Sequence, residues 1–391
     1  MPKRVEILGL IFGCIFVNVF SQSDTELNPI PSTVPFLIIA PDSRAGAMGD
    51  AGVATSPDAS AQHWNASKFA FVEGEIGFSM SFTPWLRNLV NDINLGYVSG
   101  YFRLDDRQVV SASFLYFSLG EILFRDRYGI SIGSFNPNEL AFDVAYSRQF
   151  TDNFSSALTL RFLRSDLTGG GTQGGEEYNP GISFGADLSA YYQKKIKLSD
   201  KEGEFAWGVA ISNLGSKISY TEGTEKSFIP ANLRLGGRMS VDLDDYNSIS
   251  LTVDLNKLLV PTPPEYFIDS LDDNGDKVIQ NGRTAPSSLP LSWIQSFYDA
   301  PGGFKEEFHE IMYSVGAEYW YREQFAIRAG YFYEHESKGN RKYLTAGIGL
   351  KLNVFFLDFS YLMPSSGRNN PLANTMRFTL GFIFDKFKGL R

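Results

Sequence analysis

Two Gly-x-Ser-x-Gly sequences carry the first residues that could do chemistry, because this pattern holds the nucleophilic serine of many hydrolases. They span residues 129–133 and 181–185. The pattern functions where the serine lies on a tight turn between a strand and a helix, next to an oxyanion hole. Ser183 instead alternates with Ile182 and Phe184, which is typical of a strand interior. We therefore interpret this serine and its glycines as small residues on one face of a strand.

A Gly-x-Gly-x-x-Gly sequence at Gly169, Gly171 and Gly174 resembles a phosphate-binding loop. Such a loop needs a strand before it and a helix after it. No helical pattern follows Gly174, so these glycines predict an irregular loop instead.

Histidine and cysteine are scarce. The chain contains His63, His309 and His335, without metal-ligand spacing or a nucleophile nearby in sequence. Cys14 is the only cysteine and lies in an apolar N-terminal stretch. The sequence therefore predicts a protein that is not an enzyme. One enzymatic alternative stays open, an enzyme acting on lipid, which would need His309 or His335 beside a nucleophile and an acidic residue.

A calcium ion is the one cofactor that the sequence admits. Asp272, Asn274 and Asp276 place oxygen ligands at alternate positions, as calcium-binding loops do. The glycine expected after Asp276 is missing, and no terminal acidic ligand is evident. A solvated acidic turn is the alternative, and no other cofactor is predicted.

Charge and hydropathy exclude two large classes of protein. The chain has 391 residues and a formal net charge of -9, and no basic run rises above this acidic background. Nucleic acid is therefore not an expected partner. Beyond the first residues there is no apolar run of about 18 residues, which argues against a helical membrane protein.

The elements that position these residues are short strands. Near the C-terminus, Phe378, Leu380 and Phe382 alternate with Thr379 and Gly381. A strict period of two indicates a strand whose two faces meet different media. The sequence predicts fourteen such strands, at 75–82, 93–104, 108–119, 140–150, 154–165, 181–192, 205–214, 232–241, 247–255, 313–321, 325–334, 342–350, 354–362 and 375–384.

The connections between these strands are alternately short and long. Short turns such as 105–107 and 322–324 alternate with long loops such as 120–139 and 256–312, and only 193–204 is too long for its place. This pattern predicts an all-β fold, a transmembrane antiparallel β-barrel of about 14 strands in a bacterial outer membrane, in contact with its lipid. Short turns and both termini are expected in the periplasm.

Three regions are predicted along the chain. Lys3, Arg4 and the apolar residues 7–20 indicate a signal peptide over 1–21, cleaved after Ser21. Residues 22–74 form an N-terminal periplasmic or plug segment, and residues 75–391 form the barrel.

Alternation also assigns charged residues to the barrel interior. Asp143 lies between Phe142 and Val144, so it faces inward if they face lipid. The same reasoning turns further charged residues inward, namely Arg161, Asp187, Arg234, Arg238, Asp254, Arg328 and Asp358. A paired polar lining is the simpler interpretation, and a specific ion pathway is the alternative.

The longest loop, 256–312, is rich in proline and aromatic residues. Five of its aromatic residues are candidates for contact with a partner protein: Trp293, Phe297, Tyr298, Phe304 and Phe308. A loop of this composition packs on something, either its own barrel mouth or a partner protein.

A Gly- and Ala-rich segment precedes the first strand and is too weakly apolar to be part of the wall. It could plug the periplasmic mouth of the barrel. Its motif residues are Arg44, Met48, Gly49, Asp50, Trp64 and Asn65. Residues 41–46, 48–54 and 64–65 closely resemble the N-terminal signature of the PorV/PorQ family of the type IX secretion system, within the FadL-like barrels. The departure is Ala66, where that family usually has proline.

The resemblance implies a carrier without catalytic activity. Such proteins receive cargo bearing a C-terminal signal domain at the SprA translocon, also called Sov, and pass it to a surface attachment complex containing PorU. The long loop 256–312 would then bind cargo and translocon. The runner-up is a FadL-like channel for hydrophobic small molecules, which predicts an apolar pocket beneath the outer loops and a side opening at a kinked strand.

Overall fold

The computed structural model describes residues 27–87, 89–90, 92–125, 128–173, 176–221, 226–271, 275, 277–365 and 370–384. The predicted signal peptide lies outside these residues. So do Asp272, Asn274 and Asp276, and the calcium site therefore stays a prediction. Among the described residues, no helix combines the length and apolarity needed to cross a membrane.

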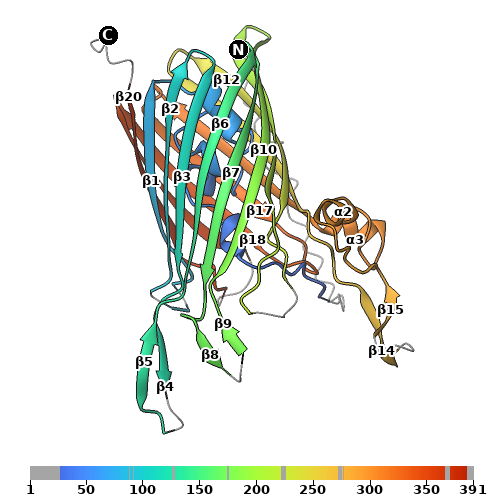
Figure 1. The fold of residues 1–391 in the computed structure, drawn as a ribbon. Coiled ribbons are helices and arrows are strands. Elements are labelled where there is room, and N and C mark those ends of the chain that lie inside the picture. The colour runs from blue at the N-terminus through green and yellow to red at the C-terminus, as the bar shows by residue number, and fades with distance from the viewer. Residues whose placement is uncertain are drawn as a thin grey trace.

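One sheet of fourteen antiparallel strands closes on itself as a barrel (Figure 1). In order around the wall, the strands are β1 (Ile76–Pro84), β2 (Asn94–Asp105), β3 (Gln108–Ser118), β6 (Asn138–Thr151), β7 (Phe154–Asp166), β10 (Gly181–Leu198), β11 (Lys201–Gly215), β12 (Asn232–Asp244), β13 (Asn247–Leu258), β16 (Ile311–Tyr321), β17 (Phe325–Tyr333), β18 (Lys342–Leu352), β19 (Phe355–Pro364) and β20 (Thr375–Phe384). β20 pairs with β1 from Phe378↔Phe82 to Phe384↔Ile76 and closes the ring. The predicted fold class and all fourteen predicted strands are confirmed.

The two ends of the barrel differ as the connection lengths predicted, with one correction. β10 continues to Leu198 and β11 begins at Lys201, so Ser199 and Asp200 alone form the turn. Ser199 has φ 56°, which fits a tight hairpin. The prediction of a long connection at 193–204 was wrong. Most of these residues belong to β10 and β11, which continue beyond the point where apolar and polar residues alternate.

Three hairpins in the long loops were not predicted as strands. They pair β4 (Ile122–Arg125) with β5 (Ser131–Phe135), β8 (Gly171–Gln173) with β9 (Glu176–Tyr178), and β14 (Glu265–Leu271) with β15 (Lys277–Asn281). β8 begins at the second glycine of the Gly-x-Gly-x-x-Gly sequence, so a hairpin follows Gly169 where a phosphate site would need a helix.

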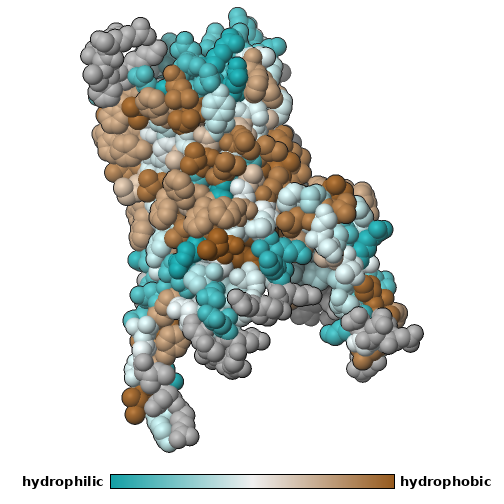
Figure 2. All heavy atoms as spheres, in the orientation of Figure 1, coloured by the Kyte–Doolittle hydropathy of each residue, from teal (hydrophilic) through white to brown (hydrophobic). Residues whose placement is uncertain are grey.

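The wall separates an apolar outer face from a polar inner face. Along β6, Phe142, Val144 and Tyr146 are exposed while Asp143 between them is buried. Figure 2 shows this outer face as brown spheres on the side of the barrel, with teal spheres near the end that carries the short turns.

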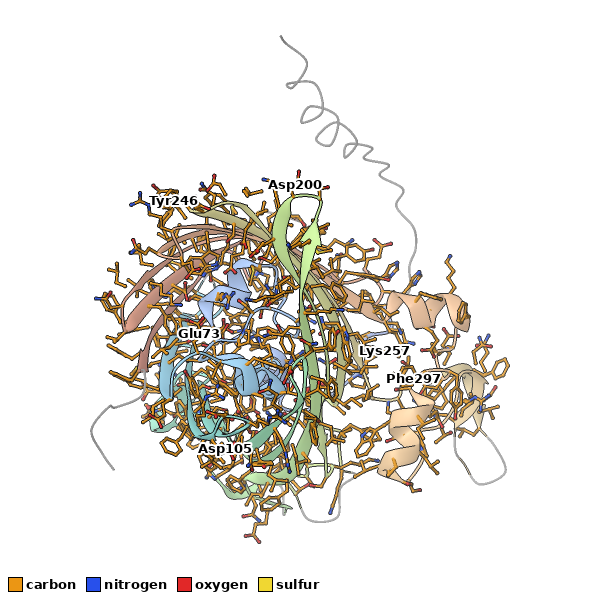
Figure 3. The ribbon with its side chains drawn as sticks, turned by 90° about the horizontal axis from the view of Figure 1, so that it is seen from above. Glu73, Asp105, Asp200, Tyr246, Lys257 and Phe297 are labelled. Atoms are coloured by element: carbon orange, nitrogen blue, oxygen red, sulfur yellow. The ribbon has the colours of Figure 1, made fainter. Side chains whose placement is uncertain are left out.

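The interior is occupied by residues 27–74, which we call the lumenal segment. It contains η1 (Pro35–Ile38), α1 (Ser43–Ala47), η2 (Ala61–His63) and η3 (Ala66–Phe71). Seen along the barrel axis, these blue elements lie within the ring of strands (Figure 3).

The lumenal segment runs from one end of the barrel to the other. At the long-loop end, the Asn28 N–H donates to the Ser337 carbonyl at 2.9 Å. At the short-turn end, the Tyr101 hydroxyl donates to the Glu73 carbonyl, just before β1. The expectation of a plug confined to the mouth with the short turns is therefore corrected, because the first described residues lie at the opposite mouth.

The loop between β13 and β16 forms a separate body, the lateral lobe (residues 259–310). It contains α2 (Leu289–Gln295), α3 (Phe304–His309) and the hairpin β14/β15. Figures 1 and 3 show it beside the barrel, outside the ring of strands.

Candidate functional site

The lumenal segment rests on glycines of the wall. A Cβ atom added at any of five inward-facing glycines would lie less than 3.0 Å from atoms of this segment. This glycine seat consists of Gly208, Gly236, Gly316, Gly330 and Gly347. At Gly330 the obstructing atoms are backbone atoms of Met48 and Gly49. The backbone of the segment therefore packs directly on the backbone of the wall, which explains why its signature is rich in Gly and Ala.

Wall side chains also satisfy the buried backbone of this segment. One carboxylate oxygen of Asp254 on β13 accepts the N–H groups of Gly52 at 2.7 Å and Val53 at 2.9 Å. The Thr345 hydroxyl on β18 accepts the N–H of Gly49 at 2.9 Å. Because a buried N–H without a partner is costly, these bonds hold the segment at a defined depth.

Arg44 of α1 joins the segment to an ion-pair network in the wall. Its guanidinium donates twice to Glu318 on β16, at 2.9 and 2.7 Å, and once to Asp58 at 2.8 Å. Glu318 also accepts a 2.6 Å bond from Arg328, which in turn donates to Asp358 at 2.6 Å. This bidentate, charge-assisted arrangement gives the segment a fixed orientation as well as an attachment.

The other motif residues are placed inside the barrel too. Trp64 donates from Nε1 to Asp42 at 2.6 Å, and Asp50 accepts a 2.6 Å bond from the Tyr343 hydroxyl. The Asn65 amide donates to the Val53 carbonyl within the segment and to the Ala190 carbonyl on β10 of the wall, both at 3.0 Å. The structure thus brings Arg44, Met48, Gly49, Asp50, Trp64 and Asn65 together as contacts of a packed lumen.

Replacing Ala66 by proline is expected to be tolerated. Ala66 is the first residue of η3, where the missing N–H of proline costs least, and Asn65 before it is extended at φ -166° and ψ 97°. We expect the free energy of unfolding to stay within about 1 kcal/mol of wild type in urea titrations.

Ala45 provides the contrast for Ala66→Pro. Its N–H donates to the Asp42 carboxylate at 2.9 Å and caps α1. Ala45→Pro removes this bond and should destabilise the protein by about 1 to 3 kcal/mol. Equal effects of the two substitutions would contradict the assignment of Ala66 to the first turn of η3.

The end of the lumen nearest the long loops is filled by apolar side chains of the lumenal segment. Phe36 and Leu37 of η1 are buried among wall residues that include Leu95, Tyr97 and Phe117. The rings of Phe36 and Phe117 stack with centroids 6.1 Å apart. The region beneath the outer loops is therefore apolar, but the chain's own side chains occupy it.

The charged residues predicted to face inward are buried and several are paired. Arg161 donates to Asp143 at 2.7 and 2.8 Å and to Asp187 at 3.1 Å. Ser183, the serine of the Gly-x-Ser-x-Gly sequence, lies within β10 and donates to the carbonyl of Ser216 at 2.7 Å. The interior thus shows the predicted paired lining around Arg161, and Ser183 is a small inward residue of a strand.

The lateral lobe is anchored to the outer face of the wall by a buried cation. Lys257 lies on β13 at an outward-facing position, yet only 8% of it is exposed because α3 covers it. Its amine is 3.0 Å from Glu307 and 2.5 Å from Glu310. Lys338, in the β17–β18 connection, is 2.5 Å from Glu306 and 3.1 Å from Glu310. Lys257 on the wall and Lys338 in the β17–β18 connection therefore hold α3 in place. They pair with two carboxylates of α3 and with that of Glu310, the residue after it.

The five predicted partner-binding aromatic residues all lie in this lobe, but not in one cluster. Phe297, Phe304 and Phe308 line a cavity of about 230 Å³ against the outer face of the wall. Trp293 and Tyr298 do not line this cavity, and the Tyr298 ring faces the Arg283 guanidinium at 5.0 Å. The loop was expected to pack on the barrel mouth or on a partner protein. In the structure it packs on neither of these but on the outer side of its own barrel.

Asp299 is expected to make the stability of the docked lobe depend on pH. Burial, reinforced by the nearby carboxylates of Glu310 and Glu307, raises the pKa of Asp299 to about 7. A raised pKa stabilises the docked lobe below the ordinary pKa of aspartate, and this contribution is lost as pH rises towards 7. Asp299→Asn should therefore raise the melting temperature relative to wild type at pH 8, and the difference should shrink by pH 5.

Other groups also titrate in this range, and their contributions cancel when the melting temperatures of Asp299→Asn and wild type are subtracted at each pH. His309 at the end of α3 and His335 in the β17–β18 connection stack with ring centroids 3.5 Å apart, and burial lowers the pKa of each. Their contribution weakens as pH falls, opposite in sign to that of Asp299. A difference that stays constant from pH 5 to pH 8 would contradict the role of Asp299.

His309 and His335, the two candidates for the lipid-enzyme hypothesis, are in contact with each other as a stacked pair. The His335 ring stacks on His309, and its Nδ1 accepts the backbone N–H of Ser337 at 3.2 Å, which is a local turn. His63 lies in η2 within the lumen, where its carbonyl accepts a bond from Arg234. Among the described residues, no group of three or more His, Cys, Asp or Glu side chains could hold a metal ion.

Fold and site together define an outer-membrane β-barrel whose lumen is occupied by its own N-terminal segment. The chain belongs to the PorV family: the family model described as type IX secretion system protein PorV matches residues 22–265. The whole lumenal segment and the wall from β1 to β13 fall within the match.

Several solved structures are similar in fold at low identity. The CymD monoaromatic hydrocarbon channel is 11% identical, with 89% of this chain and 99% of that chain covered and a TM-score of 0.47. The toluene transporter TbuX of Ralstonia pickettii is 12% identical over 89% and 97%, with a TM-score of 0.42. A FadL homologue of Pseudomonas aeruginosa is 9% identical over 92% and 100%, with a TM-score of 0.40. No curated protein matches the chain.

Proposed function

We propose that this protein is a carrier of the type IX secretion system. In this role it binds secreted proteins that bear the C-terminal signal domain at the SprA/Sov translocon and passes them to the attachment complex containing PorU. The short turns face the periplasm and the long loops the cell exterior, so the lumenal segment begins at the outer mouth. The protein itself carries out no catalytic step.

The observation that carries this proposal is the lumen occupied by the chain's own N-terminal segment in a member of the PorV family. Ala51, Val53 and Ala54 are fully buried, Val53 against the glycine seat, and Phe36 is fully buried near the long-loop end. A carrier needs no passage through its barrel, whereas a channel does. The occupied lumen therefore favours an activity at the outer surface.

Two surfaces at the long-loop end are suited to contact other proteins. One is the lateral lobe, with Trp293, Phe297, Tyr298, Phe304 and Phe308. The other is the hairpin β4/β5, which projects from the barrel (Figure 1) and exposes Leu123, Phe124, Tyr128 and Ile130. A two-stranded hairpin with apolar residues exposed is only marginally stable in water, which favours burial against a partner.

Affinity capture from detergent-solubilised outer membranes tests the proposal. The tagged wild type should retain SprA and proteins with the C-terminal signal domain. Leu123→Ser with Ile130→Ser, and separately Trp293→Ser with Tyr298→Ser, should reduce this retention. Leu251→Gln on the wall, far from both surfaces, serves as the matched control. If the wild type retained neither protein class while a fatty acid copurified, the carrier proposal would fail.

The alternative is a FadL-like channel for hydrophobic small molecules, which predicts a side opening at a kinked strand. Away from the short turns, the described wall shows a register shift between β10 and β11, at Ala186 and Leu188. The apolar region beneath the outer loops, which would receive the substrate, contains Phe36 and Leu37. The occupied apolar region weighs against this alternative, whereas the shift in β10 is compatible with it. The fatty-acid result of the capture experiment would favour the channel.

A further inference from the structure

We propose that the cavity between α3 and the outer face of β12 and β13 binds an acyl chain of a membrane lipid. The cavity is lined by apolar side chains of the wall and of the lobe: Leu233, Leu235, Leu255, Phe297, Phe304 and Phe308. This inference rests on the outer-membrane location of the barrel and not on the secretion partners.

The wall side of this cavity is a continuation of the lipid-facing surface. Along β13 the outward-facing residues are Ile249, Leu251, Val253 and Leu255, all exposed, and the next outward position is Lys257. Leu235 on β12 is the direct cross-strand partner of Leu255. Whatever fills the cavity therefore lies in one continuous apolar surface with the lipid around the barrel.

The lobe side of the cavity is held rigidly against the wall. The pairing of Lys257 with Glu307 and Glu310 places α3 directly over the outer end of the apolar column. Phe304 and Phe308 meet edge to face with centroids 4.7 Å apart, and Phe304 is 78% exposed. A preformed cleft of this kind loses little conformational freedom when a flexible chain enters it.

The polarity of the cavity selects a hydrocarbon chain. Asn256, Lys257 and Glu307 also line it, but Lys257 and Glu307 are paired with each other at 3.0 Å. The remaining surface is aliphatic and aromatic, which offers contact to methylene groups and no further charge to a polar ligand. Figures 1 and 2 show the lobe beside the brown outer face of the barrel, where acyl chains are available. Trp293 and Tyr298 lie outside the cavity and stay available for protein contact.

Photolabelling in lipid nanodiscs tests this site. The full protein is reconstituted with phosphatidylethanolamine that carries a diazirine on one acyl chain, and labelled residues are identified by mass spectrometry after illumination. Labelling should be enriched on Phe304 and Phe308 relative to Leu251, which is 54% exposed on the same outer face. Leu255→Gln should reduce labelling of α3 by roughly tenfold, as expected when a leucine in contact with the acyl chain is replaced by a polar group.

Leu251→Gln is the matched control, because it makes the same change on the same strand and face outside the cavity. It should leave labelling of α3 unchanged, and heat-modifiable migration checks that both variants keep a closed barrel. Phe308 replaced by benzoylphenylalanine in living cells gives a second readout, a lipid-mass adduct. Uniform labelling of α3 and Leu251, no effect of Leu255→Gln, or protein adducts alone at Phe308 would overturn the inference. Loss of lipid labelling with intact capture of SprA would leave the carrier proposal standing.

Discussion

Gly330→Ala is expected to displace the lumenal segment from its seat while the wall remains closed. The added Cβ would lie within 3.0 Å of backbone atoms of Met48 and Gly49, which no side-chain rotation relieves. Overpacking alone costs about 1 to 3 kcal/mol, and here the loss extends to the bond between Gly49 and Thr345. We therefore expect a loss of at least about 3 kcal/mol in the free energy of unfolding.

Two measurements separate displacement of the segment from general damage. Conductance across planar bilayers should rise, because an empty fourteen-stranded barrel is wide enough for water and ions. Urea unfolding gives the loss of stability. Gly237→Ala is the control, since its Cβ would meet its nearest atom, the Ala206 carbonyl oxygen, only at 4.0 Å. Equal behaviour of the two variants would show that the glycine seat does not hold the segment.

Lys257→Met should release the lateral lobe from the wall. The substitution keeps a long apolar side chain but leaves Glu307 without its cation and Glu310 with Lys338 alone. Breaking a buried pair by removing one partner costs about 3 to 5 kcal/mol, because the remaining charge is uncompensated. We expect faster hydrogen exchange in α2 and α3 and new proteolytic cuts within the lobe, with no change in β1 to β3.

Lys277→Met is the matched control in the same lobe. Lys277 is exposed on β15, where its amine lies 5.8 Å from the centroid of the Tyr266 ring. Its loss should cost less than about 1 kcal/mol. Adding Glu307→Gln to Lys257→Met should recover part of the protection, because it removes the carboxylate that Lys257→Met leaves without a cation. Unchanged exchange in Lys257→Met would mean that other contacts dock the lobe.

The strands of the wall were predictable because one face of each is apolar and the other polar. Phe142, Asp143 and Val144 carry this signal within three residues, and no distant contact is needed to read it. The hairpin β4/β5 was not predicted because Ile122, Leu123 and Phe124 are all exposed, so the two faces of its strands do not differ. Its existence depends on pairing with β5 and not on a boundary between two media.

The contacts of the site were less predictable than its residues. The small residues of the lumenal segment indicated close packing, but in sequence Gly330 is one inward residue among many on β17. Its role appears only when Gly49, nearly three hundred positions earlier, lies against it. Likewise Lys257 has the place of a lipid-facing residue by alternation, and its burial depends on Glu307 and Glu310 beyond a loop of about fifty residues.

The path of the lumenal segment constrains the order in which the barrel assembles. The segment contacts β1 through Ser60 and Ser79 at 2.9 Å and β20 through Ser43 and Thr379 at 2.8 Å. Across the ring it contacts β11 and β12 at Gly208 and Gly236 of the glycine seat. β1 and β20 are the two strands whose pairing closes the ring. A segment in contact with both sides of that seam, and anchored at the far wall, acts as an internal template. We therefore expect enclosure of residues 27–74 and closure of the β1–β20 pair to be coupled when the barrel assembles.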